Sequence, residues 1–211
     1  MSSVLQESSE WIDGFLFVAN RRILDFLNTR PVLAQGATEL LPDFHALERW
    51  FIAAGIVSSI RAKRLLQSWR NSPEAAAFLE DLLAFRERLL DAVVRMEGGL
   101  SPSNGFIREL NARLLQHPST TVLRKREDRI VREPLFDPQR LADLWTPLLD
   151  DAAVLLSEPE THRLRQCEAC VVHFFDTSKK GSRRWCSMNI CGNKLKVAAY
   201  QRRKRNNKAD R

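Results

Sequence analysis

Apolar side chains recur at steps of three and four along most of the first 156 residues, a spacing that predicts amphipathic helices packed on a shared core. The clearest helix begins with Ser72 as N-cap and Pro73 as its first residue, and Gly98 and Gly99 end it. Its buried face is predicted to consist of Phe78, Leu82, Phe85, Leu89 and Val93.

Five further helices follow from the same spacing and from residues that start or stop helices. They are expected at 19–29, from Pro42-Asp43 to Gly55, from a Ser58 cap to Trp69, at 103–116, and from Asp137-Pro138 to about Leu156. A short apolar strand is expected at 14–17.

Residues 120–135 carry a different pattern, in which apolar and polar positions alternate on both sides of Glu127-Asp128. Period-two alternation around a polar turn indicates a β-hairpin. Residues 1–156 are therefore predicted to form a mainly α domain with one β-hairpin, an α+β body.

The helical period stops at 157–160, Ser-Glu-Pro-Glu, which predicts a linker and a second domain at 157–211. The net charge of +7 is spread unevenly along the chain. Residues 157–211 contain 14 Lys or Arg and 5 Asp or Glu, whereas residues 1–156 contain 19 Lys or Arg and 21 Asp or Glu. A near-neutral body with a strongly basic second domain suggests a polyanionic partner for that domain. A solubilising tail is the plainer alternative.

The composition, 44% hydrophobic and 28% charged, is that of a globular protein with a buried core. No stretch approaches the ~20 apolar residues that cross a bilayer, and residues 1–10 do not resemble a signal peptide. A cytoplasmic protein without membrane contact is therefore expected.

All four cysteines lie in the second domain, as C-x2-C, fifteen residues, then C-x4-C. In a reducing compartment, clustered cysteines are metal ligands more often than disulfides. Cys167, Cys170, Cys186 and Cys191 are predicted to bind one Zn²⁺ with all four positions filled by protein, which gives a structural site without a catalytic water. This spacing favours zinc over free thiols or a redox pair. A redox pair is further disfavoured because no thioredoxin-like βαβ pattern surrounds either pair of cysteines.

Two neighbours of the cysteines have ordinary structural interpretations. His173 is expected to be a strand residue or to support the ligands, because four thiolates already satisfy the ion. Trp185 is expected to pack over the small core of the module rather than stack on a base.

The segment from Arg183 to Lys194 resembles the bacterial CGNR-type zinc finger. Its sequence is Arg-Arg-Trp-Cys-Ser-Met-Asn-Ile-Cys-Gly-Asn-Lys. Cys167, Cys170 and the Phe174-Phe175-Asp176 segment are similar to the rest of that finger, so the resemblance covers about residues 163–205. It implies a treble-clef-like fold and DNA binding. The family's usual arginine is Lys194 here, which keeps the charge but loses a bidentate donor.

The body resembles the ABATE domain that precedes this finger in putative stress-induced transcription regulators. Residues 25–29, 47–56 and 83–90 carry the resemblance. It implies a DNA-binding regulator with a stress-response role.

Nucleic-acid contacts are predicted on the finger and on a basic helix after Cys191. Lys and Arg bind phosphates, whereas Asn193 and Arg183 are candidates for base edges. Arg183 and Arg184 are expected to point to opposite faces. The predicted contact residues are Arg183, Arg184, Asn193, Lys194, Lys196, Arg202 and Arg203.

Polar residues in the helical body suggest a possible effector pocket formed by Asn20, Asp25, Asn28 and Arg86. The same residues could instead cap helices and satisfy buried hydrogen bonds, which is the favoured interpretation.

The sequence carries no G-x-S-x-G, H-E-x-x-H or glycine-rich phosphate loop, and its four histidines are scattered, so no enzymatic activity is expected. The predicted function is a transcriptional regulator that binds DNA through a four-cysteine zinc finger, with a body that senses a ligand or forms a homodimer. The alternatives are a zinc-stabilised RNA-binding protein and a module that docks on an acidic protein.

Overall fold

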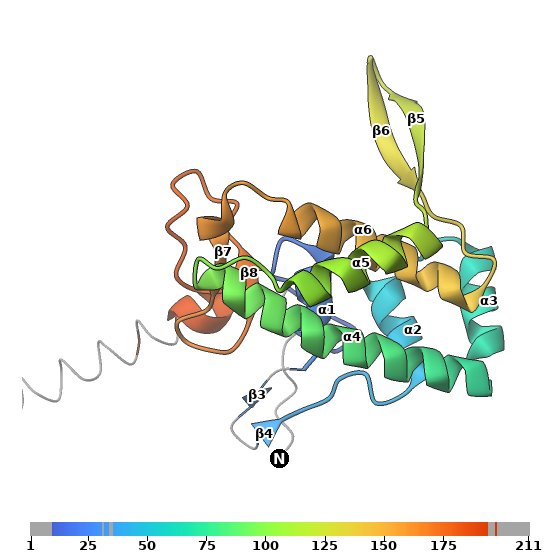
Figure 1. Cartoon of the computed structure of the whole chain (residues 1–211), viewed down its shortest axis with the longest axis horizontal. Helices are drawn as coiled ribbons and strands as arrows, with labels where there is room; N and C mark the ends of the chain where they lie inside the picture. The colour runs from blue at the N-terminus through green and yellow to red at the C-terminus, as the bar shows by residue number, and fades with distance from the viewer. Residues whose placement is uncertain (1–9, 31, 34–35, 194–196, 198–211) are drawn as a thin grey trace, which may run out of the picture.

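The computed structural model describes residues 10–30, 32–33, 36–193 and 197. Within them, six α-helices surround one apolar core, and four two-stranded antiparallel hairpins lie around it (Figure 1). The helices are α1 (Arg22–Leu27), α2 (Phe44–Ala53), α3 (Ile60–Trp69), α4 (Pro73–Glu97), α5 (Asn104–Gln116) and α6 (Trp145–Leu156).

The longest helix, α4, spans 25 residues and has the predicted start and end. The Ser72 side chain accepts a hydrogen bond from the Ala75 N–H at 3.1 Å, and Pro73 occupies the first turn, where no N–H is needed. Gly98 forms the C-cap. The predicted apolar stripe is buried and faces α1, α2 and α5.

Three other helices begin at side-chain caps. The carboxylate of Asp43 caps α2 at 2.8 Å, as predicted, and Ser103 caps α5 at 3.1 Å. The predicted cap of α3 was wrong by one residue: Ser59, not Ser58, accepts from the Ala62 N–H. The two serines are adjacent, and only the backbone path distinguishes them.

The last helix starts later than predicted. A 3-10 turn, η1 (Leu141–Leu144), follows Asp137-Pro138, and α6 begins only at Trp145. The carboxylate of Asp143 accepts from the backbone N–H groups of Gln139 and Arg140, both at 2.9 Å. These bonds hold the chain in a tight turn and so delay the helix.

Helix α1 lies at the centre of the molecule, in contact with α4 and α6. It is shorter than the predicted 19–29 segment because Asn20 adopts a left-handed conformation, with φ of 61°. The carboxylate of Asp25 fixes the preceding turn by accepting from the N–H groups of Val18 and Ala19 at 3.1 and 3.0 Å. Ile23, Leu24 and Phe26 of α1 are fully buried.

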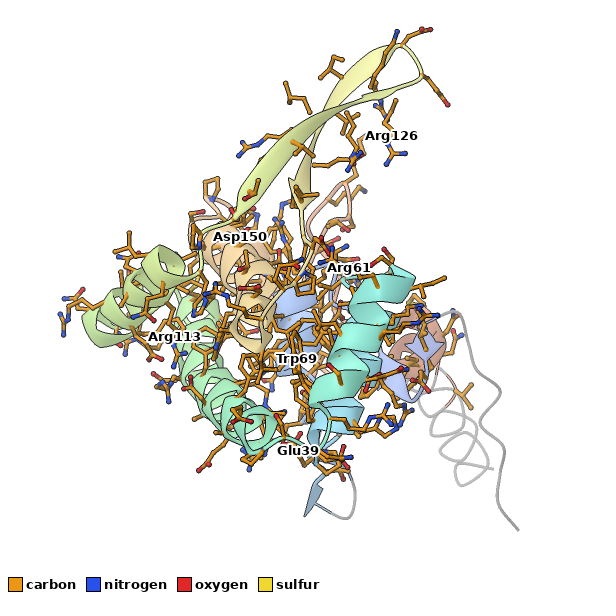
Figure 2. All side chains as sticks on the ribbon, turned by 90° about the vertical axis from the view of Figure 1, so that its right-hand side faces the viewer. Glu39, Arg61, Trp69, Arg113, Arg126 and Asp150 are labelled. Atoms are coloured by element: carbon orange, nitrogen blue, oxygen red, sulfur yellow. The ribbon has the colours of Figure 1, made fainter. Side chains whose placement is uncertain are left out.

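The predicted hairpin is present as β5 (Thr120–Arg126) and β6 (Arg129–Leu135), which are paired from Thr120↔Leu135 to Arg126↔Arg129. It projects away from the helices, and its side chains extend from both faces into open space (Figure 2). Leu123 and Ile130 are 72% and 64% exposed.

Two small hairpins lie near the start of the chain. β1 (Trp11–Ile12) pairs with β2 (Phe15–Leu16), and β2 lies within the segment predicted as a short apolar strand. β3 (Val32–Leu33) pairs with β4 (Gly36–Ala37). No helix within the described ranges is long and apolar enough to span a membrane.

The fourth hairpin, β7 (Leu164–Gln166) with β8 (His173–Phe175), begins the cysteine module, defined here as residues 161–193. A 3-10 turn, η2 (Thr161–Arg163), leads into it. Its apolar residues belong to the same buried cluster as the helices, and β8 lies directly against α1. The segment predicted as a linker is tied to the body by an ion pair between Glu158 and Arg21 at 2.9 Å.

Candidate metal centre and the surface around it

The first cysteine pair lies at the turn between β7 and β8. Cys167 follows β7, and its N–H donates to the Val172 carbonyl at 2.8 Å, which closes a tight knuckle around Cys170. All three residues of β8 are buried, so the knuckle is built on a strand fixed in the core.

The second pair lies on a short π-type turn, η3 (Met188–Gly192), and on the residues just before it. Ser187 caps this turn by accepting from the N–H of Asn189 at 3.0 Å, and its hydroxyl donates to Glu10 at 2.6 Å. Gly192 leaves room for its neighbours: a Cβ there would lie 2.6 Å from the Met188 sulfur, so the exposed Met188 side chain would have to move, and 3.2 Å from Trp185. Trp185 packs against the core, as predicted.

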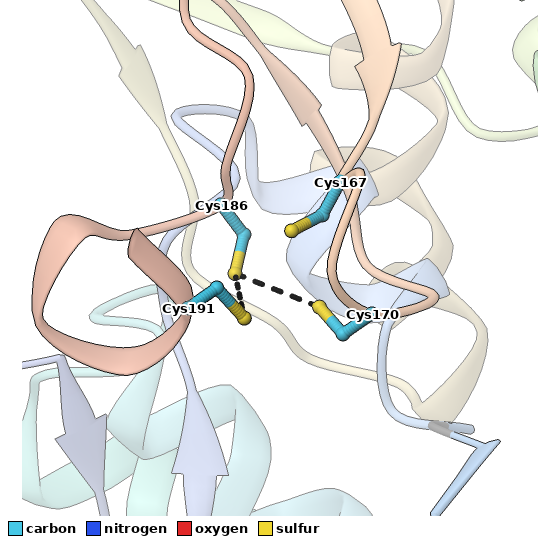
Figure 3. A group of neighbouring side chains, drawn as sticks. All are labelled: Cys167, Cys170, Cys186 and Cys191. Carbon is cyan, nitrogen blue, oxygen red and sulfur yellow. Dashed lines mark hydrogen bonds between the residues drawn. The ribbon is translucent and has the colours of Figure 1, made fainter. Parts of the chain in front are cut away.

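The four sulfur atoms converge on one point from these two segments (Figure 3). All lie within 4.8 Å of one another, with Sγ–Sγ distances of 3.7 Å for Cys170–Cys186 and 3.6 Å for Cys186–Cys191. A disulfide would require about 2.05 Å. A tetrahedral ion with metal–sulfur distances of ~2.3 Å requires sulfur–sulfur distances of about 3.8 Å. The arrangement therefore fits a metal ion, and the four predicted ligands are the group that the fold brings together.

The thiols perturb one another strongly because they are close and partly buried. The hydrogen bond between Cys170 and Cys186 lowers the pKa of Cys170 to about 5, whereas burial raises the pKa of Cys191 to about 12. A bound divalent cation removes these differences between the cysteines, because it favours the thiolate form of every ligand.

His173 is a strand residue, as predicted, and it is not part of the group formed by the four cysteines. Its Nδ1 lies 2.8 Å from the Glu97 carboxylate at the end of α4. The His173 backbone forms two bonds with one side chain: its N–H donates to Asn28 Oδ1 at 2.9 Å, and Asn28 Nδ2 donates to its carbonyl at 2.8 Å. Asn28 therefore pairs with β8 much as a neighbouring strand would.

Two further bonds attach the module to the turn before α1. The Phe175 N–H donates to the Ala19 carbonyl at 2.9 Å, and Asn20 Nδ2 donates to the Phe175 carbonyl at 2.8 Å. Asn20, Asn28 and His173 thus join segments about 150 residues apart in the sequence.

The loop after β8 is organised by Asp176, whose carboxylate accepts from the N–H groups of Ser178 and Arg183 at 2.8 and 2.7 Å. Burial acts to raise the pKa of Asp176, but these hydrogen bonds outweigh it and hold the pKa below its usual value. The loop places Lys179 and Lys180 in solvent. These two lysines were not among the predicted contacts, although the Asp-Thr-Ser-Lys-Lys-Gly run is typical of an exposed turn.

The adjacent arginines point in different directions, as predicted. Arg183 is half-buried, with Nε donating to the Trp185 carbonyl at 2.8 Å and Nη2 to the Val18 carbonyl at 3.2 Å, and it covers the Phe174 ring. Its guanidinium is thus already engaged within the protein. Arg184 is exposed and forms an ion pair with Glu168.

The other predicted contact residues lie at or beyond the last described turn. Asn193 is exposed at the end of η3. Lys194, Lys196, Arg202 and Arg203 lie outside the described residues.

The residues predicted for an effector pocket do not form one site. Asn28 and Arg86 line a cavity of about 340 Å³ between α1, α4 and the module. Asn20 lines a different cavity of about 590 Å³, beside α6. Asp25 lines neither of these two, and its carboxylate supports the turn before α1.

A helical body joined to a four-cysteine metal module is the architecture of a regulatory zinc-finger protein. Residues 163–204 match the model of the CGNR zinc finger. Residues 20–159 match the model of the ABATE family, described as "Putative stress-induced transcription regulator". The chain therefore belongs to the ABATE family, and both resemblances found in the sequence are confirmed. A search of curated proteins finds no match.

Proposed function

We propose that this protein is a transcription regulator of the cytoplasm that binds duplex DNA through its cysteine module, with Zn²⁺ as the structural ion. A closed set of four thiolates is typical of structural zinc. The proposed role is therefore binding, and no catalysis is assigned to the site. A stress-response role comes from the family description alone.

The observation that carries the proposal is the concentration of positive charge on the second domain, which comprises the cysteine module and the residues that follow it in the sequence. Residues 157–211 have 14 cations against 5 anions, and Lys179 and Lys180 are exposed on the loop that Asp176 organises. Cations on a rigid loop can neutralise phosphates without reading sequence. Asn193 is the exposed candidate for a base contact. Arg183 stays a prediction for that role, although its contacts support a structural one.

The body is proposed to hold an effector or to mediate dimer formation. A ligand bound between body and module could change how the module is held, since β8 is attached to α1 by Asn28 and to α4 through Glu97. The exposed β5–β6 hairpin is the surface we assign to a second copy of the chain. Size-exclusion chromatography with light scattering tests the dimer.

The test of the function is binding of the metal-loaded full chain to three polyanions: duplex DNA of random sequence, a structured RNA and polyglutamate. We expect tightest binding to duplex DNA, a log–log decrease with salt of about 0.9 per phosphate bound, and loss of binding after chelation. A preference for RNA, or for polyglutamate, would replace the proposal with the corresponding alternative. Zinc is tested separately by elemental analysis, with one equivalent per chain expected.

A further inference from the structure

A turn that carries two lysines follows β8 and is closed by its own backbone. The Gly181 N–H donates to the Ser178 carbonyl at 3.1 Å, which makes Lys179 and Lys180 the central residues of a β-turn. Gly181 has a φ of 58°, a conformation that glycine adopts without strain. Both lysines are exposed. The turn therefore presents two positive charges to solvent at a fixed place on the module.

Two arginines at the start of the module hold this turn by its carbonyl groups. Arg163 Nη1 donates to the carbonyls of Asp176 and Ser178 at 3.0 and 2.9 Å. Arg165, on β7, donates through Nη2 to the Gly181 carbonyl at 3.0 Å. The turn is thus attached to the β7 segment on both sides of the lysines, so its position is set by the fold before any partner binds.

The charge of Arg165 is not neutralised by these contacts. Its Nε and Nη2 donate to the backbone carbonyls of His162, at 3.2 Å, and Gly181, which carry no net charge. The ion pairs found among the described residues of the module involve Arg163, His173 and Arg184. None of them involves Arg165 or the two lysines of the turn, so these three cations keep their full charge.

Arg165 also lines a groove of about 560 Å³ between the end of α4 and the module. Two carboxylates line this groove, and both are engaged: Glu168 pairs with Arg184, and Glu97 lies 2.8 Å from His173 Nδ1. The turn lysines are not among the lining residues. The three uncompensated cations are therefore spread from the groove to the turn beside it. Such a spread suits successive phosphates of a nucleic-acid backbone, whereas one free phosphate would require cations that converge on a point.

We propose that Arg165, Lys179 and Lys180 form one basic surface that binds the sugar–phosphate backbone of duplex DNA. Arg165 has two roles in it, because it positions the turn through Gly181 and contacts a phosphate in the groove. The fold fixes these cations in advance, so binding loses little loop and side-chain entropy. This inference rests on the proposed function and names the surface through which the module meets DNA.

The test is the salt dependence of binding to duplex DNA of random sequence, measured on the metal-loaded full chain. Arg165→Gln removes one phosphate contact, so we expect the log–log slope to fall by about 0.9 and the affinity at low salt to fall about fivefold. Arg165→Lys keeps the charge and loses the attachment of the turn, so it should bind more weakly than wild type with an unchanged slope.

Arg108→Gln is the matched control, because Arg108 is exposed on α5 and the change removes the same net charge far from the basic surface in the sequence. We expect its slope to equal that of wild type. Equal slopes for Arg165→Gln and Arg108→Gln would overturn the assignment of Arg165. Zinc content and melting temperature of each variant show whether the module is still folded.

Backbone amide NMR of the wild-type protein maps the same surface without a substitution. A short DNA duplex should shift the signals of Arg165, Lys180 and Gly181, and inorganic phosphate at equal ionic strength should not. Identical shifts with phosphate alone would overturn the assignment to a DNA backbone. DNA binding that leaves these signals unchanged would overturn the surface while the proposed function stands, whereas no binding of duplex DNA under any condition would overturn both.

Discussion

Two hairpins of this molecule, β5–β6 and β7–β8, differ in length and in how they are held. β5–β6 has seven residues in each strand and exposes nearly all of them, whereas β7–β8 has three in each and buries all of β8. The short hairpin positions the metal ligands, and the long one projects from the body (Figure 1). A hairpin becomes a rigid scaffold here through packing and long-range hydrogen bonds rather than through strand length, since isolated hairpins are marginally stable.

The largest effect should follow from removing a metal ligand. Cys186→Ser leaves three thiolates, and because metal binding and folding of such modules are coupled, the module should unfold. We expect zinc content to fall from one equivalent per chain to near zero, with a loss of stability of at least about 3 kcal/mol by analogy with other lost structural metals. Elemental analysis and urea unfolding measure both. A variant that keeps its zinc and its stability would contradict the coupling.

A second prediction uses pH to loosen the attachment of β8. Burial raises the pKa of Asp25 from 3.8 to about 7, against the effect of the Ala19 and Val18 N–H groups. The folded state therefore binds this proton more tightly than the unfolded state does, and ionisation opposes folding. The contribution of this group to the free energy of unfolding is fully present below about pH 4. It is lost as the pH rises through 7, which lowers the free energy of unfolding by up to about 4 kcal/mol.

Asp25→Asn isolates this contribution, because the amide oxygen can still accept from Val18 and Ala19. The difference in unfolding free energy between the variant and wild type should change with pH between about 4 and 7 and become flat above. Hydrogen exchange of the Phe175 N–H, which is bonded to Ala19, reports the same loosening locally. A difference that does not vary with pH would show that Asp25 titrates normally.

A smaller effect is expected from the side chain that pairs with β8. Asn28→Ala removes both bonds to His173 and leaves a buried N–H and carbonyl unpaired, which costs about 2–3 kcal/mol. Asn28→Asp keeps the acceptor for the His173 N–H and loses the donor, so it tests the two bonds separately. Thermal unfolding measures both variants. A loss below about 0.5 kcal/mol for Asn28→Ala would mean that β8 is held by apolar packing alone.

The smallest effect should come from the exposed hairpin. Leu123→Thr and Ile130→Thr change side chains that are mostly in solvent, so each should alter stability by less than about 0.5 kcal/mol. Chemical unfolding at low protein concentration is the appropriate measurement, since it avoids the proposed dimer. A loss above about 1 kcal/mol in the monomer would remove the contrast between the hairpins.

The features that the sequence predicted are those with local signals. The 25-residue α4 has a cap, a proline and a repeating apolar stripe, and the β5–β6 hairpin has alternation around a polar turn. The cysteines have a characteristic spacing. In each case neighbouring residues contain the relevant information.

The attachment of the module to the body could not be predicted in this way. Asn28 and His173 are 145 residues apart, and Arg183 bonds to Val18 across 165 residues, so no periodicity connects them. The two-residue strands β1 to β4 are too short for any pattern. The sequence pattern suggested a linker at 157–160, whereas long-range bonds join the two parts into one core. The division into domains at 1–156 and 157–211 stays a prediction.

The central claim is that the cysteine module, and not the cation-rich β5–β6 hairpin, binds DNA. The most direct test compares the salt dependence of DNA binding in two matched double variants, Lys179→Gln with Lys180→Gln on the module, and Arg124→Gln with Lys125→Gln on β5. Each removes two positive charges. We predict that the module variant weakens binding and lowers the log–log salt slope by up to about 1.8, or about 0.9 for each phosphate no longer neutralised, while the β5 variant leaves the slope unchanged. A lower slope in the β5 variant, with wild-type behaviour in the module variant, would contradict the account.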